Sequence, residues 1–434
     1  MHQRFKFRES SELLARAKEL GPDLPFSEDI TALFKPAYLG ERKIINRMLV
    51  QPMEGYDSLP DGSPSELTIR RYHRYAEGGS AIIWFEAIAV RHDGKSNPRQ
   101  LMITAANTDK YKKLIAEMRD MAPATDPFLV AQITHSGRYS KPDGKPCPLV
   151  PQNNPLLDKG DPKVLSDSEL TEIRDSMVLS ARLAKEAGFD AVDLKACHGY
   201  LVHELLSSRD RKNSVYGGEE PASRFRFLLE TIEIIKSEVG IAITPRLNIT
   251  DLYKGGFGTS SDGLYPDLTE PLLLISEFRK LGVSLLNITM GSPYYNPYVV
   301  RPFDTPVPGG VLPEEDPLAG VIRMTEGTAL IQRSFPDILI AGSGYSWLRQ
   351  FAPNVGAAVV ASGDAAFIGF GRNSFAYPSM PADLLKTGKA DPAKVCITCS
   401  GCTRLIQNLR PGGCVTRDRE IYGEELKKLI RDGK

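Results

Sequence analysis

Short apolar runs rich in β-branched residues recur along the chain, and stretches with a helical repeat separate most of them. Eight of these runs have the length and composition of buried strands. They are residues 43–53, 80–90, 128–135, 189–196, 241–248, 283–290, 338–343 and 365–370. Between them, segments such as 66–79 and 109–122 place charged and apolar residues at helical spacing. The pattern therefore predicts eight strands that alternate with helices.

The segment before the fourth run carries the clearest helix signals. Ser166 and Glu169 have the spacing of a capping box, and Gly188 stands where a C-terminal cap belongs. Apolar and charged residues alternate at helical spacing through 170–188. We therefore expect one long helix between Ser166 and Gly188.

Eight strand-then-helix units fit a (β/α)8 TIM barrel, an α/β fold placed here at residues 33–381. An open doubly wound sheet is the competing architecture, but the turn after the first strand reads LVQPMEGYD and not G-x-G-x-x-G. Residues 1–32 are then an N-terminal arm, and residues 382–434 are a cysteine-bearing extension. A Pro/Gly-rich stretch at 294–318 is expected to shape the pocket.

Charge and hydropathy exclude several classes of partner. Lysine plus arginine and aspartate plus glutamate each number 54 among 434 residues, so no global field favours nucleic acid or an anionic membrane. No apolar run approaches the roughly 20 residues of a membrane span. The N-terminal residues lack the apolar core of a signal peptide. We therefore expect a cytoplasmic protein with reduced thiols.

In a barrel of this kind, the carboxyl ends of the strands form the active-site face. The residues at the first five of these ends are Pro52, Met53, Glu86, Ala87, Gln132, His135, Lys195, His198, Tyr200, Arg246 and Asn248. Arg246 and Gln132 have the chemistry to bind the carbonyl and ring nitrogen of a heteroaromatic ring. A structural hydrogen-bond network inside the barrel is the alternative.

The turns after the last two strands have the composition of a phosphate site. AGSGYS at 341–346 and GFGR at 369–372 contain Gly342, Gly344 and Gly371, which allow close backbone approach, and Arg372, which adds charge. Barrels often bind phosphate between strands seven and eight. Ordinary strand-to-helix turns are the alternative.

The fourth strand ends in the polar cluster of VDLKACHGYL, residues 192–201. A buried ammonium needs a partner, so Lys195 should reach the barrel mouth or bond a neighbour such as Asp193. His198 and Tyr200 could then bind a carbonyl or carboxylate oxygen and deliver a proton. A solvated strand end, with Tyr200 as a packing ring, is the alternative.

Four of the six cysteines lie in the C-terminal extension as C-x2-C-x2-C-x11-C, namely Cys396, Cys399, Cys402 and Cys414. Three closely spaced thiolates plus one distant ligand suit a cubane iron–sulfur cluster better than zinc, whose ribbons use two separated pairs. A zinc site and free or redox-active thiols are the alternatives.

Several of these motifs, in their order, resemble the old yellow enzyme family of FMN-containing ene-reductases. The resemblance extends from about Leu33 to about Pro381 and rests on HGYLVHELLS, VYGGEEPASRFRFLLE, QITHSGR and GFGRNSFAYP. It implies a TIM barrel that holds FMN without a covalent bond. The residues that resemble the contacts to the flavin ring and ribityl chain are Pro52, Met53, Ala87, Gln132 and Arg246. Those that resemble the phosphate grip are Gly342, Ser343, Gly344, Gly371 and Arg372.

The resemblance also implies the chemistry. Lys195 and His198 occupy the positions that bind the activating oxygen of an unsaturated small molecule, and Tyr200 occupies that of the proton donor. Hydride would come from reduced FMN. Lys195 departs from the family's usual histidine, and Glu54 departs from a small flavin-tuning residue.

The cysteine tail is similar to that of larger clostridial-type relatives such as dienoyl-CoA reductases, which read C-x2-C-x3-C-x11-C and imply a [4Fe-4S] cluster. Those relatives continue into a region for a second flavin and a nicotinamide nucleotide, whereas this chain ends 20 residues after Cys414. We therefore expect electrons from a ferredoxin, a flavodoxin or a flavoprotein subunit, or directly from NAD(P)H. A homo-oligomer would be typical of the family.

The sequence leaves two other functions open. Cluster-bearing relatives include amine or N-methyl dehydrogenases, for which Tyr294, Tyr295 and Tyr298 could line an aromatic bowl. A non-catalytic subunit that keeps the barrel is the second alternative.

Overall fold

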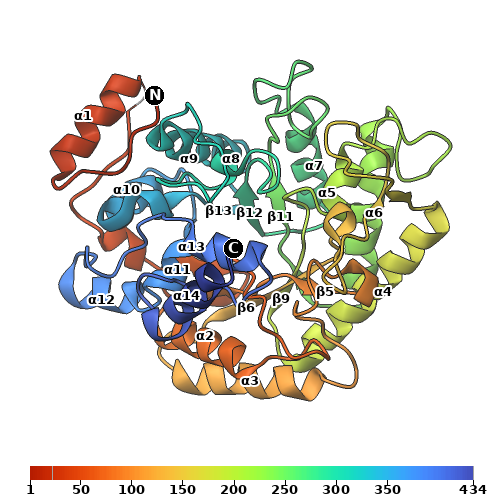
Figure 1. Ribbon diagram of the computed structural model, residues 1–434, viewed down its shortest axis with the longest axis horizontal. Coiled ribbons are helices and arrows are strands. Elements are labelled where there is room, and N and C mark those ends of the chain that lie inside the picture. The colour runs from red at the N-terminus through yellow and green to blue at the C-terminus, as the bar shows by residue number, and fades with distance from the viewer. Residues whose placement is uncertain (22, 434) are drawn as a thin grey trace.

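The computed structural model describes residues 1–21 and 23–433 and has parallel strands at its centre, surrounded by helices (Figure 1). The strands of the central sheet are β3 Met48–Val50, β4 Ile82–Trp84, β5 Ile88–Ala89, β6 Phe128–Thr134, β9 Ala191–Leu194, β10 Ala242–Ile243, β11 Arg246–Asn248, β12 Leu285–Thr289, β13 Leu339–Gly342 and β14 Phe367–Phe370. Two small sheets pair β1 Ala37–Leu39 with β2 Arg42–Ile44, and β7 Leu149–Val150 with β8 Lys163–Val164.

The sheet closes on itself through one divided strand. Its order is β10-β9-β6-β4-β3-β14-β13-β12-β11, and every pair is parallel. β10 and β11 lie at opposite ends of this order, although both belong to the single run 241–248. Pro245, which has no N–H to donate, separates them, and a bridge between Ala196 and Leu247 completes the ring. The eight predicted strands and the (β/α)8 barrel are therefore confirmed.

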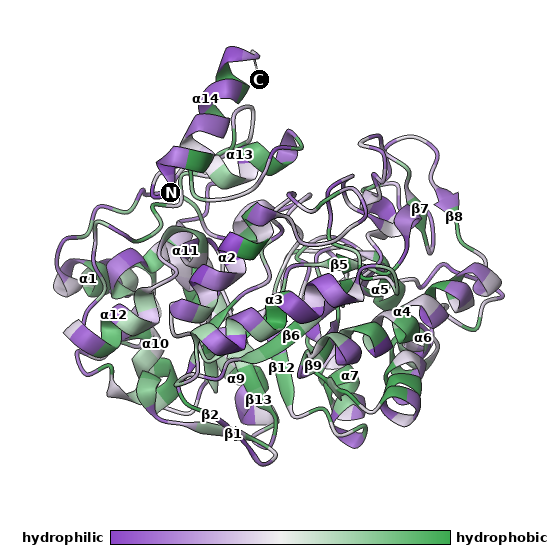
Figure 2. Ribbon diagram, turned by 90° about the horizontal axis from the view of Figure 1, so that it is seen from below, coloured by the Kyte–Doolittle hydropathy of each residue, from purple (hydrophilic) through white to green (hydrophobic). Residues whose placement is uncertain are grey.

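The chain has helices around the barrel and, in the C-terminal extension, helices over one of its ends (Figure 1, Figure 2). They are α1 Ser10–Leu20, α2 Glu66–Glu77, α3 Thr108–Met121, α4 Asp167–Ala187, α5 Leu201–Leu206, α6 Pro221–Ile234, α7 Thr269–Lys280, α8 Pro297–Val300, α9 Pro317–Ser334, α10 Ala352–Ala361, α11 Arg372–Ala376, α12 Met380–Thr387, α13 Gly401–Gln407 and α14 Glu424–Arg431. The predicted caps of α4 are present: the Ser166 hydroxyl accepts from the Glu169 N–H, and Gly188 is left-handed at φ 98°. These signals were sufficient to locate the longest helix.

The barrel strands are buried on both of their faces. All three residues of β4 are at most 1% exposed, and every residue of β6 is buried. This two-sided burial is typical of parallel strands covered by helices and explains why they appear as continuous apolar runs and not as alternating ones. The β1–β2 hairpin lies at the end of the barrel where the strands begin, opposite α13 and α14 (Figure 2).

The N-terminal arm packs against the barrel of the same chain. Phe5 and Phe7 meet the ring of Trp347 edge-on at 5.3 Å and 6.3 Å. Leu13 and Ala17 of α1 are buried in the same apolar cluster. The arm therefore extends the core beside α9 and α10. In the described part of the chain, none of the helices has the length and apolar character needed to cross a membrane.

Candidate active site

The polar cluster after β9 lies at the barrel mouth, and Lys195 points to the turn after β3. Its Nζ is 3.4 Å from Glu54 Oε1 and 3.6 Å from the centroid of the Tyr200 ring. The side chain is 5% exposed, so the ammonium needs these partners. Lys195 was predicted either to reach the barrel mouth or to bond Asp193. It reaches the mouth, and Asp193 has other partners.

Tyr200 is the most enclosed of the three predicted catalytic residues, at 2% exposed. Its hydroxyl donates to Glu54 Oε1 at 2.9 Å and lies 3.2 Å from the Tyr294 hydroxyl. Burial raises the pKa of Tyr200 well above its ordinary value, and the nearby Glu54 carboxylate adds to the effect. The phenol therefore stays protonated at neutral pH.

An aromatic wall stands beside Tyr200. Tyr139, in the turn after β6, stacks on Tyr294 with ring centroids 3.5 Å apart. Of the three tyrosines considered for an aromatic bowl, Tyr294 contacts the site and Tyr295 packs on Tyr253, with 5.1 Å between centroids. The Pro/Gly-rich stretch and the segment at Tyr139 thus meet beside Tyr200.

His198 sits in a strained turn. Its φ is 64°, and that of Gly199 is 73°, so two successive residues are left-handed. The ring Nε2 lies 3.5 Å from the Thr289 hydroxyl at the end of β12. Burial lowers the pKa of His198 well below its usual range, so the imidazole is neutral and can donate one hydrogen bond.

Glu54 joins these groups. Its Oε1 receives the Tyr200 hydroxyl and faces Lys195, while its Oε2 accepts from the Ser96 hydroxyl at 2.9 Å. The side chain is 14% exposed. The sequence marked Glu54 only as a departure from the family pattern. Two features of the sequence could have indicated this ion pair. One is a carboxylate after the first strand, and the other is a lysine after the fourth strand that needs a partner.

Asp193 organises the barrel interior below the mouth. Its carboxylate accepts from Trp84 Nε1 at 2.8 Å, Gln132 Nε2 at 2.6 Å and the Arg246 N–H at 2.7 Å. Burial raises the pKa of Asp193 to about 6, although these three hydrogen bonds act in the opposite direction. Gln132 was predicted to bind the flavin, with a structural hydrogen-bond network as the alternative role. In the structure it takes part in such a network.

Two of the buried guanidinium groups that retain unused donors lie at the ends of barrel strands. Within the described residues, Arg246 Nε and Arg372 Nη1 have no hydrogen-bond partner. Arg372 Nη2 donates to the Pro302 carbonyl at 2.7 Å. An unsatisfied buried donor is costly, so both positions suit a bound group that accepts hydrogen bonds. This observation fits an anionic cofactor with one end at Arg246 and the other at Arg372.

The turn after β13 admits only small residues. Gly344 has φ 99°, and a Cβ there would lie 2.6 Å from Met324 Sδ. A Cβ at Gly342 would lie 2.8 Å from the Tyr345 hydroxyl oxygen. The turn leads into a 3₁₀ helix, Tyr345–Phe351, which lacks the dipole of a full α-helix. Ser343 donates its hydroxyl to the Ile288 carbonyl at 2.8 Å.

The other predicted flavin contacts lie around the same mouth. Pro52 is partly exposed, and Ala87 is fully buried. The Met53 sulfur would lie 3.1 Å from a Cβ at Gly371, so the ends of the first and last barrel strands adjoin. His135 accepts from the Gly137 N–H at 3.1 Å, and Asn248 donates to Asp251 at 2.7 Å. These last two side chains stabilise local turns.

The four clustered cysteines line one small cavity next to Arg372 and Phe375. Cys396 is buried, whereas Cys399, Cys402 and Cys414 are half-buried. Their shared cavity fits a soft, thiolate-bound cofactor. Over residues 1–21 and 23–433, no three of these or of any other His, Cys, Asp or Glu side chains are placed so that they could hold a metal ion. The other two cysteines lie apart: Cys197 is buried with its pKa raised to about 12 by burial, and Cys147 is exposed.

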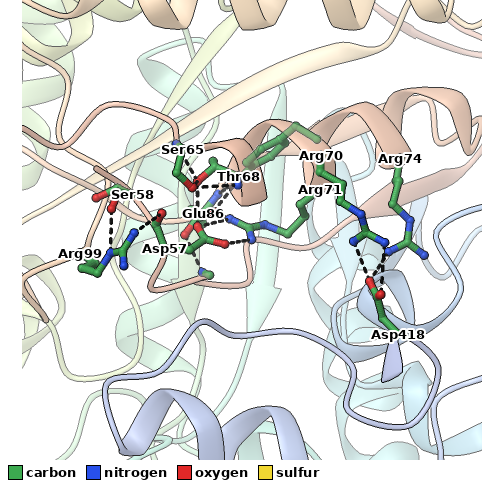
Figure 3. A network of polar contacts seen from close by, with 12 residues as sticks. Asp57, Ser58, Ser65, Thr68, Arg70, Arg71, Arg74, Glu86, Arg99 and Asp418 are labelled. Carbon is green, nitrogen blue, oxygen red and sulfur yellow. Dashed lines mark hydrogen bonds and ion pairs between the residues drawn. The ribbon is translucent and has the colours of Figure 1, made fainter. Parts of the chain in front are cut away.

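Polar contacts join the turn that carries Glu54 to the barrel and to the cysteine extension, and Figure 3 shows those of Asp57, Arg71 and Glu86. The Gly55 N–H donates to Glu86 at 2.6 Å, and its carbonyl accepts from the Gly412 N–H at 2.6 Å. Arg71 pairs with both Asp57 and Glu86 at 2.5 Å. These long-range contacts carry no local sequence signal.

The extension itself is tied to α2. Asp418, four residues after Cys414, pairs with Arg70 at 2.7 Å and with Arg74 at 2.6 Å (Figure 3). The cysteine extension is therefore joined to the Glu54 turn by the hydrogen bond from Gly412 to Gly55, and to α2 by the ion pairs of Asp418.

Comparison with known proteins assigns this barrel to a family of flavin oxidoreductases. The family described as NADH:flavin oxidoreductase / NADH oxidase matches residues 32–263, just over half of the chain. The chain belongs to this family. The class predicted from the sequence is thereby confirmed.

Particular relatives show how far the similarity extends. A metal reductase of Desulforamulus reducens is 27% identical over 394 residues, which cover 89% of this chain and 53% of that protein. The chain spans about half the length of the curated relatives it matches first. The structure of a 2-naphthoyl-CoA reductase complex superposes with a TM-score of 0.72 at 21% identity, over 92% of this chain and 58% of the other.

A shorter neighbour matches nearly end to end. The old yellow enzyme homologue of Zymomonas mobilis has a TM-score of 0.64 at 19% identity, over 89% of this chain and 98% of the other. At these identities the solved structures establish the fold alone.

Proposed function

We propose that this protein is an FMN-dependent reductase of an activated C=C bond in a small molecule such as an enone or enoate. The observation that carries the proposal is a buried, protonated Tyr200 two residues after a neutral His198, at the mouth of a barrel with two unused guanidinium donors. A proton donor and an oxygen-binding group next to a cofactor site are the requirements of this reaction.

The cofactor would be held along the mouth. Pro52, Met53, Ala87, Gln132 and Arg246 would contact the ring and ribityl chain, and Gly342, Ser343, Gly344, Gly371 and Arg372 would receive the phosphate. When bound, FMN supplies the hydride. The neutral imidazole of His198 binds the activating oxygen, and Tyr200 gives its proton to the α-carbon.

Electrons would reach the site by one of two routes. Cys396, Cys399, Cys402 and Cys414 would hold a [4Fe-4S] cluster fed by a ferredoxin, a flavodoxin or a flavoprotein subunit. The shared cavity and its contact with Arg372 support this route. NAD(P)H acting directly at the flavin is the other route.

One preparation tests the cofactors. Protein purified without oxygen is examined by visible absorption, with acid-released flavin and iron measured on the same sample. FMN with iron supports the proposal and the cluster route. FMN without iron keeps the reductase, favours NAD(P)H and assigns the cysteines to zinc or thiol chemistry. Protein that contains no flavin and takes up none on addition contradicts the proposal and favours a non-catalytic subunit.

Amine oxidation is the second candidate, because the stacked Tyr139 and Tyr294 rings beside Tyr200 offer aromatic surface to an alkylammonium group. The variant Tyr200→Phe separates the two reactions. Reduction of an enone should slow at protonation, by about 10²-fold or more. Amine oxidation, which needs no acid at this position, should keep its rate. An unchanged enone rate in Tyr200→Phe would contradict the reductase mechanism.

A further inference from the structure

Lys195 and Glu54 form an ion pair that the proposed reaction does not yet use. The Lys195 Nζ lies 3.4 Å from Glu54 Oε1, and the two side chains are 5% and 14% exposed. The same Glu54 oxygen accepts from the Tyr200 hydroxyl at 2.9 Å, so the pair lies one hydrogen bond away from the proposed proton donor. Water screens charges poorly at this depth. Both charges therefore act on any ligand that binds next to Tyr200.

Lys195 fills the place that a cationic ligand would take. A carboxylate beside aromatic rings suits an ammonium ion, and Glu54 lies here beside Tyr200, whose hydroxyl is 3.2 Å from that of Tyr294. The chain itself supplies the ammonium, because the Lys195 Nζ lies 3.6 Å from the centroid of the Tyr200 ring. A ligand cation at this position would meet the charge of Lys195 in a poorly solvated environment. The pair therefore opposes the binding of amines.

Glu54 acts in the same way against anions. By its charge, Lys195 would suit a substrate carboxylate, but Glu54 already neutralises it. Glu54 is held in place by Tyr200 through Oε1 and by the Ser96 hydroxyl, which donates to Oε2 at 2.9 Å. A ligand carboxylate would lose its water and face Glu54 without gaining an unpaired cation. The pair therefore opposes the binding of carboxylates as well.

The other charged or titratable groups near the mouth do not restore a preference for ions. Burial lowers the pKa of His198 well below its usual range, so its imidazole is neutral. Arg246 and Arg372 have their unused donors at the positions proposed for FMN. Arg301 contacts the cysteine extension, where its Nη1 donates to the Thr403 hydroxyl at 2.5 Å. The ion pair is therefore the charged element that a substrate meets next to Tyr200.

We infer that the Lys195–Glu54 pair is the charge filter of this active site, which admits a substrate with a neutral activating group and excludes carboxylates and ammonium ions. The inference rests on the proposed C=C reduction and narrows its substrate from an enone or enoate to an unsaturated ketone, aldehyde or ester. Because the two residues carry opposite charges, each alone would favour ligands of the other sign. Both positions depart from the family pattern, so the resemblance does not imply this filter.

The test measures the affinity of three planar ligands of similar shape and different charge, namely benzamide, benzoate and benzamidinium. Each is titrated into the full chain loaded with oxidised FMN at neutral pH, and binding is followed by the change in flavin absorbance. The proteins compared are the native protein, Glu54→Gln, Lys195→Met and the double variant. Lys280→Met, which removes a 67% exposed lysine of α7, is the matched control. Flavin content and unfolding midpoints are measured on every sample.

We expect the native protein to bind benzamide about tenfold or more tightly than either ion. Glu54→Gln leaves Lys195 without its counter-ion and should tighten benzoate about tenfold or more, because a ligand carboxylate can then pair with the ammonium. Lys195→Met should tighten benzamidinium to a similar extent, since Glu54 and the ring of Tyr200 are then free for a cation. The double variant should again prefer benzamide, and Lys280→Met should match the native protein.

A merely structural role of the pair would weaken all three ligands together. The inference is overturned if each single variant changes the three affinities by the same factor. It is also overturned if the native protein binds an ion as tightly as benzamide, or binds none of the three. Should one single variant not retain FMN, the other single variant gives the same decision.

The proposed function is tested separately on the native protein, by reoxidation of its reduced flavin with 2-cyclohexenone under anaerobic conditions. Failure of that reaction, with the charge preference intact, would contradict the reductase and leave the filter in place. Reoxidation by the enone without the charge preference would leave the reductase and remove the filter. Protein that takes up no FMN overturns both.

Discussion

Replacing Arg71 by methionine should remove the cation that holds two buried carboxylates beside the Glu54 turn. Arg71 is 5% exposed, Asp57 is fully buried and Glu86 is 2% exposed, and both N···O distances are 2.5 Å (Figure 3). Methionine fills much of the volume of the arginine stem but carries no charge. The variant therefore leaves two acidic groups in an apolar environment without their counter-ion.

The expected cost follows from this burial. Breaking a buried ion pair by removing one partner typically costs about 3–5 kcal/mol. That is a large share of the roughly 5–15 kcal/mol that stabilises a folded domain. Burial already raises the pKa of Glu86 to about 7, against the effect of Arg71, so loss of Arg71 should raise it further. A carboxyl group with a raised pKa stabilises the fold at low pH and loses that contribution as pH rises, so the deficit should grow with pH.

Denaturant unfolding of the FMN-loaded protein at two pH values measures this deficit. Arg70→Met is the matched control, because Arg70 is 40% exposed and its partner Asp418 keeps Arg74. The control should change the unfolding free energy by about 1 kcal/mol or less. The reasoning is refuted if Arg71→Met costs no more than Arg70→Met, or if its deficit shrinks as the pH rises.

Three further predictions concern the interior, the phosphate turn and the cysteines. Burial raises the pKa of Asp193 to about 6, so its contribution to the unfolding free energy should fall as pH rises from about 4 towards 6, and Asp193→Asn should lose that part of the pH dependence in denaturant titrations. Gly344→Ala should weaken FMN binding about tenfold or more in fluorescence titration, because the added Cβ meets Met324 and shifts the turn. Gly309 is also left-handed but has open space around it, so Gly309→Ala should bind FMN normally. Cys402→Ser should lose most of the iron retained by the purified protein, whereas the exposed Cys147→Ser should retain it, and equal iron in both would contradict the cluster assignment.

The barrel could be predicted from the sequence because its signals are local. Apolar β-branched runs, the Ser166 cap and the glycine at 188 act within a few residues of the chain, and each was found where the pattern indicated. Eight such units leave few architectures that bury both faces of every strand. The end of each strand then indicates which residues face the mouth, which is how Tyr200 and His198 could be selected.

Only the tertiary structure decided which partners those residues have. Lys195 and Glu54 are 141 positions apart, and Arg70 and Asp418 are 348 apart, so nothing in their neighbourhoods specifies the pairing. Asp193 lies in β9 and Lys195 directly follows that strand, yet the first binds Gln132 inside the barrel and the second reaches Glu54 at the mouth. A side chain's partner depends on which strand ends the closed sheet brings together and on how deeply each charge is buried. Sequence spacing records neither, so the chemistry around Tyr200 became readable only in the folded chain.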